Sequence, residues 1–120
     1  MSSSTLSPTD VVETYFDAWQ AQDHDRLRSI LADDVTFDGP MGHETNADDC
    51  TTSLMRLASM TRSLTVEKRF VDGPDVVTVF ELQLEPATLS PVMNWSRVQD
   101  GKIVEILVTF DPRPLLEASG

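Results

Sequence analysis

The sequence predicts an α+β fold, in which helices come first and a long antiparallel sheet follows. In the first half of the chain, apolar residues recur at helical spacing. In the second half, apolar and polar residues alternate with the period of a strand. Segregated helices and antiparallel strands are typical of α+β proteins, and the simplest packing curls the sheet around the helices, with the first helix across its concave face.

Three helices are expected before the long run of strands. The first begins after Ser7, which can cap it, and extends to about Trp19. Asp23 or its neighbour can start a second, short helix, and Asn46 can cap a third that fades near Arg62. The expected buried positions of these helices are Val12, Tyr15, Phe16 and Trp19, then Leu27, Ile30 and Leu31, then Cys50, Leu54, Leu57 and Ala58, with Met55 at the border.

Strands are expected on both sides of the third helix. A short strand over residues 35–37 runs into a turn around Gly39-Pro40 and Gly42. The later strands are expected over residues 64–71, 76–85, 92–99 and 102–110. Asp100-Gly101 is a typical hairpin turn, Pro86 and Pro91 bracket a loop, and Pro112 ends the last strand.

Composition indicates one domain over residues 1–120, with residues 1–6 as a flexible tail, since the chain is 40% hydrophobic. Asp and Glu number 20 against 9 Lys and Arg, and this net charge of −11 argues against nucleic-acid and membrane partners. No run approaches the roughly 18 apolar residues of a membrane span. One cysteine, Cys50, and an N-terminus without signal-peptide features lead us to expect a cytoplasmic protein.

Several motifs follow one another along nearly the whole chain. They are Tyr15-Phe16-Asp17-Ala18-Trp19, Leu31-Ala32-Asp33-Asp34-Val35-Thr36-Phe37, Gly39-Pro40, Trp95-Ser96-Arg97-Val98, Asp100-Gly101-Lys102-Ile103 and Phe110-Asp111. In this order they resemble the SnoaL-like and ketosteroid-isomerase-like branch of the nuclear transport factor 2-like superfamily. The resemblance implies a cone-shaped, curved antiparallel sheet around the helices, a deep apolar pocket, and commonly a homodimer packed through the sheet. It also implies acid–base chemistry on small apolar molecules without a metal.

The resemblance implies oxygen-binding roles for Tyr15 and Asn94. A ketosteroid isomerase uses a tyrosine of its first helix to donate a hydrogen bond to the substrate oxygen, and Tyr15 stands at that position. Asn94 stands where the isomerase has a protonated Asp, and an amide donates a hydrogen bond there without needing a proton. Tyr15 can equally be a core aromatic whose hydroxyl is satisfied locally.

Three residues are candidates for moving a proton. The isomerase base precedes the proline of the turn, where this chain has Gly39, with the carboxylate one residue earlier at Asp38. Because a one-residue slip reverses a strand side chain, Asp38 reaches the pocket only if the strand has already ended. His43 can face the pocket mouth, and Asp111 is a further counterpart of the SnoaL-like acid–base pair. Each also has a structural alternative, as a turn, loop or capping residue.

Aromatic and methionine side chains are expected to line an apolar pocket. The expected ligand-binding residues are Trp19, Phe37, Met41, Met55, Phe80, Phe110 and Asp111. The two histidines are far apart and no Gly-rich phosphate loop is present, so no metal or cofactor is expected. Epoxide-hydrolase chemistry is set aside, because Gln99 and Val108 stand where the resemblance would require acids.

The sequence is compatible with two functions. The first is a cofactor-independent isomerase or cyclase for a small hydrophobic, carbonyl-bearing molecule, with Asp38 or His43 as the base and Tyr15 and Asn94 polarising an oxygen. The second is a non-catalytic small-molecule-binding or dimeric protein-interaction module. Strand alternation places Trp95 opposite Asn94, on an outer sheet face that needs cover, so a homodimer is expected in either case.

Overall fold

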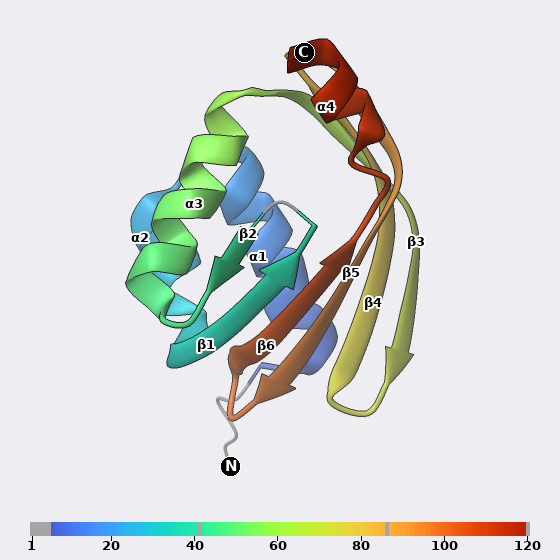
Figure 1. Ribbon diagram of the computed structural model, residues 1–120. Helices are drawn as coiled ribbons and strands as arrows, with labels where there is room; N and C mark the ends of the chain where they lie inside the picture. Colours follow the sequence, from blue (N-terminus) through green and yellow to red (C-terminus); the bar gives the residue numbers. More distant parts are fainter. Residues whose placement is uncertain (1–5, 41, 86, 120) are drawn as a thin grey trace.

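The computed structural model describes residues 6–40, 42–85 and 87–119, and these residues form four helices and a six-stranded sheet (Figure 1). The elements in chain order are α1 (Pro8–Gln20), α2 (His24–Ser29), β1 (Leu31–Gly39), β2 (Gly42–Glu44), α3 (Ala47–Ser59), β3 (Thr61–Asp72), β4 (Asp75–Leu84), β5 (Thr88–Gln99), β6 (Lys102–Thr109) and α4 (Arg113–Ser119). The α+β class expected from the sequence is confirmed.

The expected helix caps are all present. Ser7 Oγ accepts the backbone N–H of Asp10 at 3.1 Å, and Asp23 Oδ1 accepts that of Arg26 at 3.2 Å. Asn46 Oδ1 caps α3 with a hydrogen bond of 2.8 Å. These short side chains satisfy backbone donors that have no partner inside the helix, which is why the helices begin where the sequence indicates.

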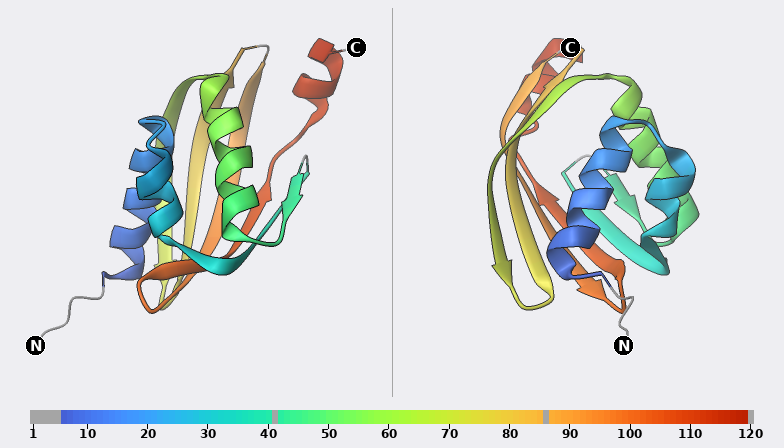
Figure 2. Two further views of the ribbon diagram at one scale, coloured as in Figure 1. Left: turned by 90° about the vertical axis from the view of Figure 1, so that its left-hand side faces the viewer. Right: turned by 180° about the vertical axis from the view of Figure 1, so that it is seen from behind.

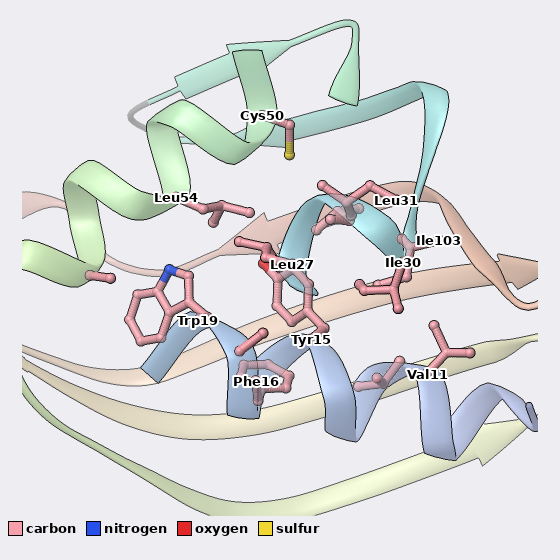
Figure 3. Close-up of a cluster of buried hydrophobic side chains, with 14 of the residues drawn as sticks. Val11, Tyr15, Phe16, Trp19, Leu27, Ile30, Leu31, Cys50, Leu54 and Ile103 are labelled. Atoms are coloured by element: carbon pink, nitrogen blue, oxygen red, sulfur yellow. The ribbon is translucent and has the colours of Figure 1, made fainter. Parts of the chain in front are cut away.

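The strand order across the sheet is β2-β1-β6-β5-β4-β3. All neighbouring strands are antiparallel except β1 and β6, which run parallel. The sheet is therefore mixed, whereas the sequence predicts an antiparallel one. The sheet curves, and α1, α2 and α3 lie on its concave side (Figure 2). Figure 3 shows the buried cluster between these layers, in which Leu27, Leu31 and Ile103 are fully buried.

The register of β5 is confirmed in full. Asn94, Ser96 and Val98 are buried, whereas the three residues Trp95, Arg97 and Gln99 that alternate with them are exposed. Because successive strand residues point to opposite faces, this pattern directs Asn94 toward the helices.

Some boundaries differ from the sequence expectation. β1 spans nine residues where the sequence predicts a short strand, and β2 is not foreseen by it. β5 begins at Thr88, so Pro91 lies inside the strand, near an irregularity in its register with β4. The last strand ends at Thr109, before Pro112. Pro114 lies in the first turn of α4, a position that tolerates proline because the N–H has no helical partner there.

Candidate functional site

A cavity of about 520 Å³ lies between α1, α3 and the concave face of the sheet. Small-molecule sites typically measure about 300–1,000 Å³ and are mostly apolar. Aromatic and aliphatic side chains form most of this wall, among them Phe16, Leu54 and Leu82. The wall therefore suits a hydrophobic ligand, and the few polar groups within it decide how such a ligand is oriented.

Three polar side chains form a hydrogen-bonded series from β5 to α1. The Ser96 hydroxyl donates to Asn94 Oδ1 at 2.6 Å, and Asn94 Nδ2 donates to the Tyr15 hydroxyl oxygen at 3.5 Å. Tyr15 and Asn94 are 3% and 2% exposed, and both line the cavity. Since the Tyr15 oxygen accepts the bond from Asn94, its own O–H is left to donate to a ligand.

Burial keeps the Tyr15 hydroxyl in its neutral, donating form. Loss of solvation raises the pKa of Tyr15 well above its ordinary value, the neighbouring Cys50 raises it further, and the hydrogen bond from Asn94 has a smaller, lowering effect. Tyr15 is therefore a phenol at neutral pH. Asn94 contributes an amide N–H beside it, and two such donors at one point of an apolar wall suit a carbonyl oxygen.

Asp38 does not line the cavity, contrary to the expectation that it faces the pocket. β1 continues to Gly39, so strand alternation still applies at Asp38. Phe37 and Gly39 line the cavity, whereas Asp38 between them pairs with His43. Asp38 could reach the pocket only if the strand ended before it. Because the strand continues through Asp38, its side chain points away from the cavity.

His43 is directed outward for the same reason. Gly42 and Glu44 of β2 line the cavity, and His43 lies between them. The side chains of His43 and Asp38 are 64% and 53% exposed. Asp38 is also the cross-strand neighbour of Leu107, an exposed residue of β6, which places the pair on the convex face. Neither side chain is therefore placed to act as a general base on a ligand in the cavity.

Glu44 supplies the carboxylate that the cavity wall contains, and the sequence reasoning missed it. It lies opposite Phe37 in the β1–β2 pair, and its Oε2 accepts a hydrogen bond of 2.6 Å from the Ser53 hydroxyl of α3. The signal that could have found Glu44 is alternation through Gly42-His43-Glu44, a stretch in which the glycine favours a turn instead. Once β2 is recognised, its first and third residues share the inner face.

Glu44 is the one carboxylate among the residues that line the cavity in the described part of the chain. Burial and the charge of Glu44 raise the pKa of Cys50 to about 12, so Cys50 remains a thiol at neutral pH. Burial also raises the pKa of Tyr15, which is likewise protonated at neutral pH. Within the described lining, Glu44 is therefore the candidate proton acceptor.

The expected ligand-binding residues divide into three groups. Trp19, Phe37, Phe80 and Phe110 line the cavity. Met55 is absent from the lining and packs, partly buried, against the core, and Met41 lies outside the described residues. Their contact with a ligand stays a prediction.

Asp111 does not line the cavity. It accepts hydrogen bonds from the backbone N–H of Arg113 at 3.0 Å and from its guanidinium at 2.6 Å. These bonds, and the charge of Arg113, hold the pKa of Asp111 below its ordinary value. The alternative noted from the sequence, a capping acid at the end of the sheet, matches this placement.

Within residues 6–40, 42–85 and 87–119, no group of three or more His, Cys, Asp and Glu side chains is placed to hold a metal ion. Over the same residues, no helix is both long and apolar enough to cross a membrane.

Comparison with solved structures identifies the fold. A nuclear transport factor 2-like protein of unknown function from Cytophaga hutchinsonii superposes with a TM-score of 0.85 at 24% identity, over 97% of this chain and 99% of that one. A steroid delta-isomerase from Pseudomonas aeruginosa gives 0.79 at 21% identity, over 98% and 89% of the two chains. An LEH-like epoxide hydrolase from M. tuberculosis gives 0.75 at 22% identity, over 92% and 87%. These identities establish a shared fold and nothing about the reaction.

Comparison at the level of sequence identifies the family. Curated proteins gave no match. The profile of the SnoaL-like domain, however, matches residues 12–106, which extend from α1 through most of β6. Together with the curved sheet and its nuclear transport factor 2-like neighbours, this match shows that the chain belongs to the SnoaL-like domain family.

Proposed function

We propose that this chain is a cofactor-independent acid–base enzyme, of the isomerase or cyclase type, for a small hydrophobic molecule that carries a carbonyl group. The observation that carries the proposal is the content of one apolar cavity: the neutral donors Tyr15 and Asn94, and the carboxylate of Glu44. A donor pair and a base are the two components that proton abstraction next to a carbonyl requires.

The proposed reaction assigns one task to each polar group. The Glu44 carboxylate removes a proton from the carbon next to the carbonyl, and negative charge develops on the carbonyl oxygen. Tyr15 and Asn94 donate hydrogen bonds to that oxygen and stabilise the enolate. In a β,γ-unsaturated substrate the charge spreads over a dienolate, and Glu44 returns the proton to the γ-carbon, which moves the double bond and gives an isomer. Alternatively, the enolate carbon attacks a second carbonyl carbon of the same molecule, and the resulting alkoxide takes the proton back from Glu44, which closes a ring.

Local contacts support these roles. Ser53 holds Glu44 Oε2, while Oε1 has no hydrogen-bond partner among the described residues and is left for the substrate proton. Ser96 occupies Asn94 Oδ1, so the amide presents its N–H groups toward Tyr15. A steroid delta-isomerase on the same fold is consistent with this chemistry.

Hydrogen exchange at an activated ketone tests the proposal without knowledge of the natural substrate. 2-Tetralone, an apolar ketone with acidic C–H bonds beside its carbonyl, is incubated with the protein in deuterium oxide and loss of the C–H signal is followed by NMR. Glu44→Gln is expected to slow the protein-dependent exchange by about a hundredfold or more. Tyr15→Phe is expected to slow it while leaving Glu44 in place.

Asp38→Asn is the matched control, because it removes a carboxylate from the neighbouring strand on the opposite face. It should exchange 2-tetralone at the wild-type rate. Exchange that is equal in wild type and Glu44→Gln, with 2-tetralone bound by both, would reject the enzyme and leave a non-catalytic binding module. Slow exchange in Asp38→Asn but not in Glu44→Gln would reverse the assignment of the base.

We also propose that the convex sheet face packs against a second copy of the chain. Four apolar residues are consecutive cross-strand neighbours over β3, β4, β5 and β6: Phe70, Val77, Trp95 and Leu107. Trp95 and Leu107 are each 46% exposed, and Phe70 is 54% exposed. A contiguous apolar row on a sheet face marks an interaction surface. The same row on a second copy of the chain can cover it, which is the arrangement of a symmetric homodimer.

A further inference from the structure

The indole nitrogen of Trp19 is a buried hydrogen-bond donor without a protein partner. The Trp19 side chain is 3% exposed and lines the cavity, and its Nε1 meets no acceptor among the described residues. A buried tryptophan N–H usually finds a partner, because leaving it unpaired forfeits the hydrogen bond that it made with water. An orphaned donor in the wall of a cavity therefore indicates an acceptor on whatever fills that cavity.

Trp19 is positioned to act together with Tyr15. The two residues are four positions apart on α1, and side chains at this spacing share one helix face. Four residues advance a helix by about 6 Å, which is within the length of one small molecule. Figure 3 shows the indole nitrogen and the phenol oxygen both on the side of α1 that faces α3.

The other polar groups of the wall do not satisfy this donor. Glu44 Oε2 is bound by Ser53, and Asn94 Oδ1 is bound by Ser96. In Figure 3, Leu54 is the labelled α3 side chain that lies toward the Trp19 ring. The indole nitrogen is buried in a mostly apolar wall, which suits a neutral acceptor such as a ketone, ether or ester oxygen rather than a hydrated charge.

We propose that the ligand of this cavity carries two oxygens: a carbonyl bound by Tyr15 and Asn94, and a second, neutral acceptor bound by Trp19 Nε1 about one helical turn away. The placement of the first oxygen rests on the proposed function. The second oxygen makes Trp19 a specificity-determining residue, which selects dioxygenated substrates, such as diketones, keto ethers and keto esters, over plain ketones of the same shape.

The test uses ketone probes that differ only in the second oxygen. 5-, 6- and 7-methoxy-2-tetralone are each compared with the ethyl-2-tetralone of the same substitution pattern, which has similar shape but lacks the acceptor. Wild-type protein is expected to bind at least one methoxy isomer about fivefold more tightly than its ethyl partner. In Trp19→Phe, which removes the N–H and keeps an aromatic ring, the two should bind equally.

An NMR readout separates hydrogen bonding from packing. The indole proton of Trp19 should shift downfield when the preferred methoxy isomer binds and not with its ethyl partner. Trp95 is an internal control, since its Nε1 already donates to Asp75 at 2.9 Å on the convex face. Its signal should not respond to either probe.

The outcomes distinguish this inference from the proposed function. A methoxy preference that survives in Trp19→Phe, or the lack of any preference in wild type, overturns the second oxygen site while Glu44-dependent exchange of 2-tetralone would still stand. Preference lost in Trp19→Phe supports the site even if Glu44→Gln exchanges normally, in which case the cavity binds without catalysis. Failure of every tetralone to bind overturns both.

Discussion

The Ser96 hydroxyl donates a hydrogen bond of 2.6 Å to Asn94 Oδ1, across two residues on the buried face of one strand. Residues two apart on a strand share a face, so β5 itself brings the two side chains together. The bond occupies the acceptor end of the Asn94 amide. The donor end is consequently directed at Tyr15, and Ser96 determines the direction of the donor pair although it is absent from the cavity lining.

Ser96→Ala is therefore expected to weaken both the fold and ligand binding. The substitution leaves Asn94 Oδ1 buried without a donor, at a cost of about 1–3 kcal/mol in the free energy of unfolding. It also frees the amide to rotate, so 2-tetralone should bind about fivefold more weakly. Urea denaturation and a binding titration measure the two effects. Val98→Ala, on the same strand face, is the control: it should lose stability by cavity formation and keep its affinity.

Gly42→Leu should block the mouth of the cavity. A Cβ at Gly42 would meet no atom within 4 Å, and Gly42 lines the cavity, so a larger side chain is accepted by the strand and enters the site. We expect 2-tetralone to bind about tenfold more weakly, equivalent to about 1.4 kcal/mol. The free energy of unfolding should change by less than about 1 kcal/mol. His43→Leu, one residue along and on the other face, should bind normally; if it blocks binding equally, the assigned strand register is wrong.

The free energy of unfolding should fall at alkaline pH, because the buried thiol of Cys50 and the buried hydroxyl of Tyr15 keep their protons in the folded state. The pKa of Cys50 rises from an ordinary value of 9.0 to about 12, and the pKa of Tyr15 rises in the same direction. Between about pH 9 and 12 the native thiol keeps a proton that the unfolded chain releases, so the unfolding free energy decreases as pH rises through that window. The slope due to Cys50 approaches about 1.4 kcal/mol per pH unit.

Urea denaturation between pH 8 and pH 10.5 measures this slope. The slope should be shallower in Cys50→Ala, even if that variant is less stable than the wild type at pH 8. Iodoacetamide supplies an independent check, because the native thiol should react only after unfolding. Rapid modification of the native protein at pH 9 would show that Cys50 is not protected as described.

Trp95→Glu should dissociate the proposed homodimer. The substitution places a charge in the middle of the apolar row on the convex face, where a partner would have to bury it. Sedimentation equilibrium at tens of micromolar should give a dimer for wild type and a monomer for the variant. Leu116→Glu changes an exposed apolar residue of α4, outside that row, and should remain dimeric. A monomeric wild type at this concentration would remove the proposal.

Local interactions explain why much of the fold could be predicted. Ser7, Asp23 and Asn46 cap their helices through backbone groups three residues away, so the information lies within one turn of chain. The alternation of β5 is equally local, and it is enough to direct Asn94 inward. Tyr15 is placed by the same kind of pattern, the apolar face of its helix.

The tertiary structure decided where the base lies. A single residue of register separates Asp38, on the convex face, from Glu44, in the cavity, and this register depends on β1 continuing to Gly39 and pairing with β2 and β6. The partner strand β6 comes from the far end of the chain, so no local pattern around Asp38 reports that pairing. Strand propensity is weak next to such cross-strand contacts.

The sequence by itself thus determined the α+β class, the helix starts and the inward face of Asn94, because each depends on neighbours a few residues away. Only the tertiary structure decided that Glu44 faces the cavity, that the Asn94 amide meets the Tyr15 hydroxyl, and that the Trp19 nitrogen is left without an acceptor among the described residues. Those three facts depend on which distant groups meet in the closed fold. Whether a buried polar group forms a hydrogen bond depends on the groups that the fold places around it, and not on that residue alone.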